Sequence, residues 1–295
     1  MSFENIKYAV IGYPVAHSLS PQMQNAGFET IGMGSPYAKI EVSTEDLGRF
    51  VNFARKQLNG FNITVPHKQN IIPFLDEVEP NARAAGSVNT VSINDGKLHG
   101  YSTDGYGLEM ALGEAFGLKI RGASILFIGC GGAVKAVSFH FAAHGATKLF
   151  FVNRTIANAE KLSAELCREF PGLEVASCAT ADADNISRLA ASSNVVIQGT
   201  SLGLKNDDPM PVKPELIKHL PYYETIYKPT ALLTKMHELG ASTADGRTML
   251  LHQGARSFEI WTGHAAPLAA MRNSLEKSIN SGMFPGKPLY INDLL

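Results

Sequence analysis

Short runs rich in β-branched and aromatic residues alternate with helical patterns along the whole chain. The first part reads KYAVIG, then SPQMQNAGFETIG, then YAKIEV, then TEDLGRFVNFARKQL, then FNITV. Strands that alternate with helices are typical of βαβ units, in which successive strands run parallel and helices cover the sheet. The chain is therefore predicted to be an α/β protein with mostly parallel sheets.

One interruption of this alternation divides the chain. Two alternating runs flank Asn94-Asp95-Gly96, which is a hairpin turn signal. A second βαβ series follows, and we expect its strands at 124–129, 148–152, 174–178, 194–198 and 222–226. With 295 residues and 45% hydrophobic content, the chain is long enough for two cores. We expect domains at residues 1–104 and 105–245, while residues 246–295 form helices, without further strands, that return to the first domain.

Composition excludes several classes of protein. The 26 basic and 27 acidic residues nearly cancel, which argues against a nucleic-acid or anionic-membrane partner. Cys130, Cys167 and Cys178 lack the spacing of a disulfide framework or a structural zinc site, so we expect no metal and a reducing compartment. The longest apolar stretch, around ILFIGCGGAV, falls short of the ~20 residues of a spanning helix, and the N-terminus lacks a signal pattern. We expect a cytoplasmic protein.

The segment ILFIGCGGAVKAV reads as a buried strand, a glycine-rich turn and the start of a helix. This is the context of the dinucleotide-binding fingerprint. Gly129 permits the tight turn, Gly131 lets the backbone approach a pyrophosphate, and the helix N-terminus offers N–H groups to that anion. Val134 occupies the third glycine position of the fingerprint, so a simple strand-to-helix turn is the alternative interpretation.

The next predicted strand, KLFFVN, ends about 21 residues after Gly132, where such folds contact the adenosine ribose. Asn153, Arg154 and Thr155 stand there, and no acidic residue does. A carboxylate would accept from the 2′-hydroxyl of NAD, whereas a guanidinium and a hydroxyl suit a 2′-phosphate. The sequence predicts NADP as the cofactor, and Thr155 can also serve as a helix N-cap.

Four polar clusters of the first domain, HSLSP, NITVPHK, SVNT and STDG, fall at predicted strand ends or helix starts. Each has a structural explanation of its own, since residues such as Ser20, Asn89 and Asp104 can cap a helix or satisfy a turn. In α/β folds, however, ligands bind at such positions. Together the clusters offer the hydroxyls, amides, ammonium and carboxylate that suit a polyhydroxylated small acid: Ser18, Ser20, Asn62, Thr64, Lys68, Asn89 and Asp104.

These motifs, followed by GCGGAVKA, NRT, YKPT and GRTMLLHQGA, stand in the order found in the shikimate dehydrogenase family, which the chain resembles over nearly its full length. The resemblance implies reversible NADP-linked reduction of 3-dehydroshikimate to shikimate, a step towards chorismate and the aromatic amino acids. It implies that Lys68 and Asp104 are the catalytic pair and that Tyr227 borders the substrate. It assigns Ser18 and Ser20 to the substrate carboxylate, and the ring hydroxyls to Asn62, Thr64, Asn89 and Gln253.

The resemblance also implies a set of cofactor-binding residues. The pyrophosphate would lie on Gly129, Gly131, Gly132 and Ala133, and the adenosine phosphate on Asn153, Arg154 and Thr155. Gly246 and Met249 would lie beside the nicotinamide. Met249 shares a helix face with Gln253 and Ser257, because the three are spaced four residues apart.

Reduction of a ketone needs a proton donor at the carbonyl oxygen, and Lys68 is the donor we expect. Pro66 would end the preceding strand and turn the chain so that Lys68 faces the ligand. His67 is an alternative acid, but we interpret it as structural.

Three departures from the family pattern leave the substrate range open. Ser102 stands where the family usually has Asn, Glu224 where it has Asp, and Gln198-Gly199-Thr200-Ser201 replaces Asn-Ala-Thr-Ser. A quinate/shikimate dehydrogenase with broader cofactor use therefore stays an alternative. A non-catalytic dinucleotide-sensing regulator is a further one, although it would not need both Lys68 and Asp104. We expect a monomer or a homodimer.

Overall fold

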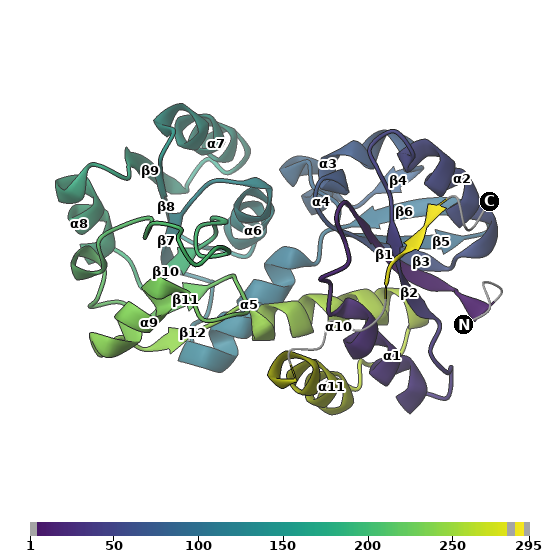
Figure 1. Ribbon diagram of the computed structural model, residues 1–295. Coiled ribbons are helices and arrows are strands. Elements are labelled where there is room, and N and C mark those ends of the chain that lie inside the picture. The colour runs from purple at the N-terminus through teal and green to yellow at the C-terminus, as the bar shows by residue number, and fades with distance from the viewer. Residues whose placement is uncertain (1–4, 282–286, 292–295) are drawn as a thin grey trace. The chain divides into compact units, whose positions relative to one another are not determined.

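The computed structural model describes residues 5–281 and 287–291 and divides into two compact units (Figure 1). The first unit comprises Met1–Gly107 and Leu250–Leu295, and the second comprises Leu108–Met249. Each unit has a sheet of its own, flanked by helices. The predicted α/β class with two mostly parallel sheets is confirmed.

The first unit contains a seven-stranded sheet in the order β13-β2-β1-β3-β5-β6-β4. β1 pairs in parallel with β2 and β3, and β5 runs antiparallel to β3 and β6. Asp95 and Gly96 join β5 to β6 with φ of 51° and 74°, as a two-residue turn with two left-handed positions requires, and the predicted hairpin is confirmed. The strands are β1 (Tyr8–Gly12), β2 (Tyr37–Glu41), β3 (Gly60–Ile63), β4 (Glu77–Val78), β5 (Thr90–Asn94), β6 (Lys97–Tyr101) and β13 (Leu289–Tyr290).

Helices cover both faces of this sheet because successive side chains of a strand point to opposite sides. In β1, Ile11 packs with Phe50 of α2, whereas Val10 packs with Phe28 of α1 and Phe258 of α10. These two clusters form the core that fixes the strand ends. The helices are α1 (Ser20–Thr30), α2 (Leu47–Gln57), α3 (His67–Asn70), η2 (Ile72–Phe74), α4 (Pro80–Ala85), α10 (Arg247–Thr262), which continues from the second unit, and α11 (Leu268–Asn280).

The C-terminal helices return to the first unit, as expected. Ser274 of α11 donates a hydrogen bond from its hydroxyl to the carbonyl of Gln22 in α1, at 2.9 Å. β12 (Thr243–Ala244) precedes α10. The expectation that no strand follows residue 246 is wrong, because β13 pairs in parallel with β2. A two-residue strand is too short to show an alternating pattern, so β13 could not be seen in the sequence.

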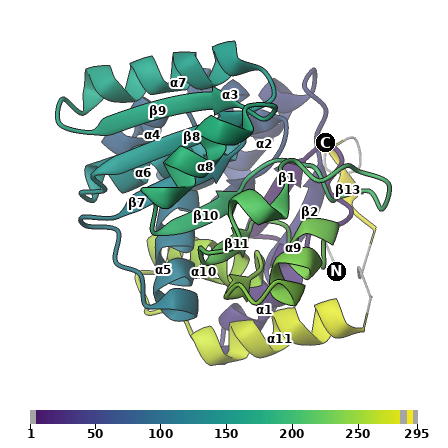
Figure 2. The same cartoon turned by 90° about the vertical axis from the view of Figure 1, so that its left-hand side faces the viewer.

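The second unit contains a six-stranded sheet in the order β12-β11-β10-β7-β8-β9, and every pairing among its described strands is parallel (Figure 2). The strand order reverses between β7 and β10, which is the point where such sheets bind ligands at their carboxyl edge. The elements are α5 (Asp104–Phe116), which leads in from the first unit, β7 (Ser124–Ile128), α6 (Gly132–Ala143), β8 (Lys148–Asn153), α7 (Ile156–Glu169), β9 (Glu174–Ala179), α8 (Ala183–Ala191), β10 (Val195–Gln198), η3 (Pro214–Leu216), β11 (Tyr222–Glu224), α9 (Ala231–Glu238) and β12.

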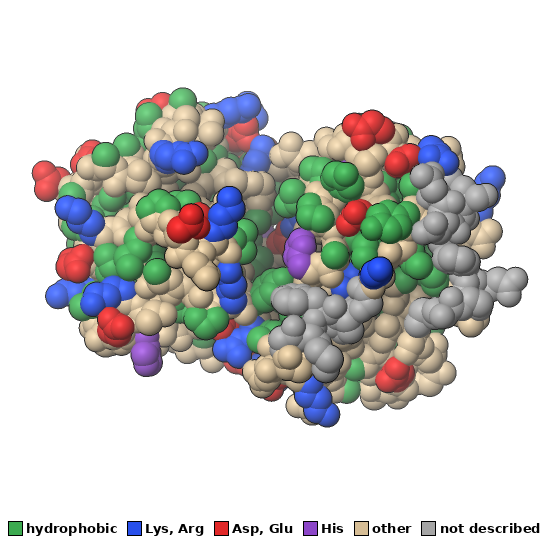
Figure 3. Space-filling model, in the orientation of Figure 1, with side chains coloured by type: hydrophobic (Ala, Val, Ile, Leu, Met, Phe, Trp, Pro, Cys, Tyr) green, Lys and Arg blue, Asp and Glu red, His purple; other side chains and the backbone are tan. Residues whose placement is uncertain are grey.

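In the second unit, too, successive side chains of a strand pack on opposite faces of the sheet. Leu126 of β7 packs with residues of α8 and α9, whereas Phe127 stacks on Phe151 of β8 and packs against Phe141 of α6. Basic and acidic side chains are interspersed on the face shown in Figure 3. None of the helices within residues 5–281 and 287–291 is long and apolar enough to cross a membrane.

Candidate active site

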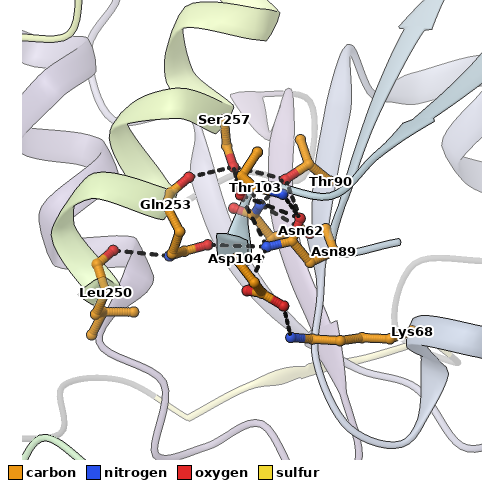
Figure 4. Close-up of polar contacts among 9 residues, drawn as sticks. All are labelled: Asn62, Lys68, Asn89, Thr90, Thr103, Asp104, Leu250, Gln253 and Ser257. Atoms are coloured by element: carbon orange, nitrogen blue, oxygen red, sulfur yellow. Dashed lines mark hydrogen bonds and ion pairs between the residues drawn. The ribbon is translucent and has the colours of Figure 1, made fainter. Parts of the chain in front are cut away.

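Lys68 and Asp104 form an ion pair at the centre of the site (Figure 4). Lys68 lies in the first turn of α3, just beyond the end of β3, and Asp104 is the first residue of α5. The Lys68 Nζ donates to Asp104 Oδ2 at 2.6 Å, and the Asp104 side chain is 7% exposed. A short charge-assisted bond to a buried carboxylate is geometrically far better defined than a surface ion pair. The ammonium is thus held in one place.

Asn89 fixes the other oxygen of the carboxylate. Its Nδ2 donates to Asp104 Oδ1 at 2.8 Å and to Thr103 Oγ1 at 2.9 Å. Its Oδ1 accepts from the backbone N–H of Thr103 at 2.8 Å, and the side chain is 3% exposed. Because the hairpin β5–β6 places residues 89 and 103 side by side, one buried amide orients the carboxylate and leaves Oδ2 for Lys68.

A second group of buried polar side chains supports this pair. Asn62 Oδ1 accepts from the hydroxyl of Tyr37 at 2.7 Å, while its Nδ2 donates to Ser257 Oγ at 2.9 Å and to Thr90 Oγ1 at 3.0 Å. The Thr90 and Ser257 hydroxyls lie 2.8 Å apart. The roles of Thr90, Thr103 and Ser257 were not predicted, although the first two adjoin Asn89 and Asp104 and the third shares the helix face of Gln253.

Gln253 joins the network from α10. Its Oε1 accepts from Asn89 Nδ2 at 3.4 Å, and its Nε2 donates to the carbonyl of Leu250 at 2.9 Å. The structure therefore brings five of the predicted residues together, as Figure 4 shows: Asn62, Lys68, Asn89, Asp104 and Gln253.

Three further predicted residues belong to the same unit, but no side-chain hydrogen bond within the described ranges joins them to this network. Ser20 is the buried first residue of α1, and its backbone N–H lies 3.3 Å from the hydroxyl of the half-buried Ser18. The half-buried Thr64 follows β3. Their hydroxyls stay available for a ligand.

His67 is completely buried, and its Nε2 lies 2.7 Å from the carbonyl oxygen of Val42. This contact ties the start of α3, and with it Lys68, to the segment after β2. The geometry supports the structural interpretation of His67, because a group without exposure and already engaged with the backbone is poorly placed to exchange a proton with substrate.

The glycine loop between β7 and α6 has the shape of a phosphate cradle. Gly129 has φ of 100°, and a Cβ there would lie 2.7 Å from Thr200 Cγ2, so glycine is required. A Cβ at Gly131 or Gly132 would meet no atom within 4 Å, which leaves open space beside the backbone. Gly131 is the N-cap of α6 and supplies no side-chain acceptor, so the first N–H groups of the helix can bind an anion. The loop fits a pyrophosphate.

Val134 fits the third glycine position because of a second change in the sequence. A Cβ at Gly199 would lie 2.3 Å from Val134 Cγ2. Gly199 stands where the usual Asn-Ala-Thr-Ser motif has alanine, and Val134 fills the space that the methyl group of this alanine would need. The valine at position 134 and the glycine at position 199 therefore compensate each other.

The end of β8 presents the residues expected at the adenosine phosphate. Asn153 closes the strand, and its Nδ2 donates to the carbonyl of Thr155 at 2.8 Å. Arg154 is exposed and has no ion pair with any side chain in the described ranges. Thr155 occupies the N-cap position of α7 without a side-chain capping bond. A guanidinium and a hydroxyl are thus free to bind a phosphate.

The remaining predicted residues lie in the second unit. A Cβ at the buried Gly246 would lie 2.1 Å from the carbonyl oxygen of Thr225, so a larger residue does not fit. The backbone N–H of Met249 donates to the hydroxyl of Tyr223 at 3.2 Å. Tyr227 is half-buried, and burial raises the pKa of its phenol. Ala133 lies exposed in the first turn of α6.

Two of the departures from the family pattern face each other in the sheet. Gln198 of β10 is in register with Glu224 of β11, and both side chains are fully buried. Gln198 Nε2 donates to the carbonyl of Leu202 at 2.9 Å, and its Oε1 accepts from the backbone N–H of Thr200. Gln198 thus holds the loop that follows its own strand.

Glu224 holds the next loop in the same way. Its carboxylate accepts from the hydroxyls of Tyr222 and Thr230, each at 3.0 Å, and from the backbone N–H of Ile226 at 3.3 Å. Burial raises the pKa of Glu224 to about 7, against the effect of these donors. The third departure, Ser102, has a buried hydroxyl with no hydrogen-bond partner in the described part of the chain.

The chain matches three models of shikimate dehydrogenase domains and several curated shikimate dehydrogenases. Residues 10–91 match the shikimate dehydrogenase substrate binding domain, residues 111–205 match the shikimate / quinate 5-dehydrogenase model, and residues 246–276 match the shikimate 5'-dehydrogenase C-terminal domain. The shikimate dehydrogenase (NADP(+)) of Aquifex aeolicus is 40% identical over 271 residues, which cover 91% of this chain and 95% of the relative. That of Methanopyrus kandleri is 36% identical over 272 residues, or 90% and 93% of the two chains.

A solved structure shows the same arrangement. Shikimate 5-dehydrogenase from Listeria monocytogenes, in complex with shikimate and NAD, has a TM-score of 0.85 and 32% identity, covering 92% of this chain and 96% of its own. Three family models match the chain in sequence order, and the relatives span nine-tenths of it. The chain belongs to the shikimate dehydrogenase family.

Proposed function

We propose that this protein is an oxidoreductase that catalyses the reversible NADP-linked reduction of 3-dehydroshikimate to shikimate. The observation that carries the proposal is the Lys68–Asp104 pair, with 2.6 Å between Nζ and Oδ2 and with Asp104 Oδ1 fixed by Asn89. A dehydrogenase needs such a fixed proton donor, whereas a protein that only senses a dinucleotide does not.

Lys68 would deliver the proton in the direction of reduction. NADPH, when bound, would supply the hydride. The Nζ of Lys68 donates a proton to the oxygen on which negative charge develops, and Asp104 keeps the ammonium oriented throughout. The Lys68 side chain is 22% exposed, so water can return the proton. A positioned acid of this kind contributes about 10²- to 10⁴-fold to the rate.

The other polar groups of the first unit would bind the substrate. Ser18 and Ser20 would bind the carboxylate, and Asn62, Thr64, Asn89 and Gln253 would bind ring hydroxyls, with Tyr227 at the border of the site. The amide nitrogen of Asn62 already donates to three oxygen atoms of the protein. Asn62 must therefore release one of these partners if it contacts a hydroxyl of the substrate directly.

The cofactor would be NADP, as the names of the relatives from Aquifex aeolicus and Methanopyrus kandleri state. The glycine loop of residues 129–133 would hold the pyrophosphate, and Gly246 and Met249 would lie beside the nicotinamide. Arg154 and Thr155 would bind the 2′-phosphate, with Asn153 shaping the turn. Two observations support this choice. The guanidinium of Arg154 lies beside the start of α7, which has no side-chain cap, and no carboxylate stands at the end of β8.

We propose that shikimate is preferred over quinate, because the relatives from Aquifex aeolicus and Methanopyrus kandleri are named shikimate dehydrogenases. Gln198 and Glu224 use their polar atoms to hold their own loops. Ser102, the third departure, lies next to Thr103 and Asp104. Its hydroxyl has no hydrogen-bond partner in the described residues, and quinate oxidation would depend on this hydroxyl. We further propose that the protein acts in the cytoplasm as a monomer or homodimer on small molecules alone.

Initial rates at the nicotinamide absorbance band, with shikimate or quinate and with NADP or NAD, test the proposal. The expected result is the highest kcat/KM with shikimate and NADP. A higher kcat/KM for quinate would overturn the substrate assignment, a higher value with NAD would overturn the cofactor assignment, and no turnover in any of the four mixtures would favour the regulator.

A further inference from the structure

Three side chains with metal-binding atoms meet in the second unit, outside the site described above. Glu109 projects from α5, His140 from α6, and His144 follows the last turn of α6. One ligand atom of each residue lies within 4.8 Å of those of the other two. The two histidines are four residues apart, so they share one helix face, and their rings stack with 3.9 Å between centroids.

The hydrogen bonds of the cluster resemble the outer shell of a metal site. The Nδ1 of His144 lies 2.7 Å from the carbonyl oxygen of His140, so this nitrogen carries the proton and donates it. The Nε2 of His144 is then left with a free lone pair. Metal-binding histidines are oriented in this way, by donation of the second ring N–H to a carbonyl or carboxylate.

The other two residues are also suited to bind a cation. Glu109 Oε2 and His140 Nε2 are 2.7 Å apart. The proton shared by these two atoms would leave when a metal ion binds, because the ligands of a metal must be deprotonated. His144 is exposed and Glu109 is partly exposed, so an ion can reach the cluster from solvent.

We infer that Glu109, His140 and His144 bind a divalent transition-metal ion such as Zn²⁺, with water as the fourth ligand. Two imidazoles and one carboxylate with an open position form a known zinc ligand set, whereas Mg²⁺ and Ca²⁺ prefer oxygen ligands alone. Glu109 stands 31 residues before His140, so spacing in the sequence did not predict this site, and the expectation of no metal rested on the cysteines.

The fit requires Glu109 to move and one imidazole ring to rotate, because the two rings are stacked with 25° between their planes, whereas an ion bound by both must lie close to the plane of each ring. Zinc ligands lie at about 2.0–2.2 Å from the metal in a tetrahedron, which places neighbouring ligand atoms somewhat more than 3 Å apart. Glu109 must therefore move away from His140 by less than about 1 Å, which its partly exposed side chain allows.

A bound ion would tie the C-terminal end of α6 to α5. The N-terminal end of α6 carries the glycine loop, so the ion would brace the helix that presents the phosphate cradle. Because an ion that binds only the folded chain stabilises it, the thermal midpoint of unfolding should rise with metal concentration.

Calorimetric titration of the tag-free full chain with ZnCl₂, and its thermal midpoint with and without Zn²⁺, test the inference. We expect one saturable site, and His144→Ala should weaken binding at least about 10-fold, since even an outer-shell partner is worth that much. His144→Ala leaves the contact between Glu109 and His140 in place, so the fold should survive. His219→Ala and Cys167→Ser control for binding by other exposed side chains and should keep the wild-type affinity.

Glu109→Gln gives an independent check, because it removes the carboxylate charge at constant shape and should also weaken Zn²⁺ binding at least about 10-fold. Absence of saturable binding, or an affinity that neither His144→Ala nor Glu109→Gln changes, would overturn the inference. Loss of binding in Cys167→Ser alone would assign the ion to the thiol and overturn it as well.

Discussion

Glu224→Gln should change how the stability of the protein depends on pH. The Glu224 carboxyl is completely buried, and its described partners are two hydroxyls and one backbone N–H, with no cation among them. Its pKa is raised from the ordinary 4.5 to about 7 in the folded chain. In the pH interval between these values the folded protein keeps a proton that the unfolded chain has released, so stability falls as the pH rises.

The size of the effect follows from that interval. The stabilisation that a raised carboxyl pKa provides is fully present below the pKa of the unfolded chain. It is lost as the pH rises to the pKa of the folded chain, and above that value the unfolding free energy no longer changes because of this group. An interval from 4.5 to about 7 corresponds to about 3 kcal/mol of unfolding free energy. Glutamine has nearly the same shape and never ionises, its oxygen can accept from Ile226, and the Tyr222 and Thr230 hydroxyls can rotate to accept from its amide. The Glu224→Gln variant should therefore lack the fall in unfolding free energy that Glu224 causes as the pH rises.

Urea unfolding followed by far-UV circular dichroism measures the difference. The unfolding free energy of Glu224→Gln minus that of the wild type should rise by about 3 kcal/mol between about pH 5 and about pH 8. Trp261, the single tryptophan, lies in the first unit, so its fluorescence reports that unit separately. A difference that stays constant over this pH range would refute the reasoning.

Three further changes test the cofactor site, the carboxylate support and the glycine loop. Arg154→Ala should lower the kcat/KM ratio of NADP to NAD about 10- to 150-fold, because a charge-assisted bond to phosphate is worth about 1.5–3 kcal/mol; equal losses for both cofactors would instead indicate stacking on adenine. Asn89→Ala should lower kcat about 10²-fold through misplacement of the carboxylate, and an unchanged kcat would contradict its role. Gly199→Ala should destabilise the protein by about 1–3 kcal/mol in urea unfolding, because its Cβ would lie 2.3 Å from Val134, and Val134→Ala should rescue it; a double variant no more stable than Gly199→Ala would contradict the compensation.

The fold was predictable where strands are fully buried. β7, predicted at 124–129 and observed at Ser124–Ile128, is an unbroken apolar run because a parallel strand is covered on both faces. β12 and β13 have two residues each, and their strand conformation depends on partners that are distant in the sequence. No local pattern could show them.

The candidate site was predictable only in part, for a similar reason. Motifs at strand ends identified Lys68, Asn89 and Asp104, whose proximity the structure shows. Ser257 is separated from Asn62 by 195 residues, so its hydrogen bond with Asn62 depends on tertiary packing. The departure at Gln198 left the substrate range open, and the sequence could not show that this side chain binds the loop after β10.

The most direct test of the account is the turnover of Lys68 variants in NADP-linked shikimate oxidation. Lys68→Ala should lower kcat about 10²- to 10⁴-fold, or roughly 3–5 kcal/mol, with a smaller effect on the KM for shikimate. Lys68→Met, which keeps most of the stem but lacks the ammonium, should be equally impaired, while circular dichroism shows both variants folded. Near wild-type kcat in either folded variant would contradict the assignment of Lys68 as the proton donor.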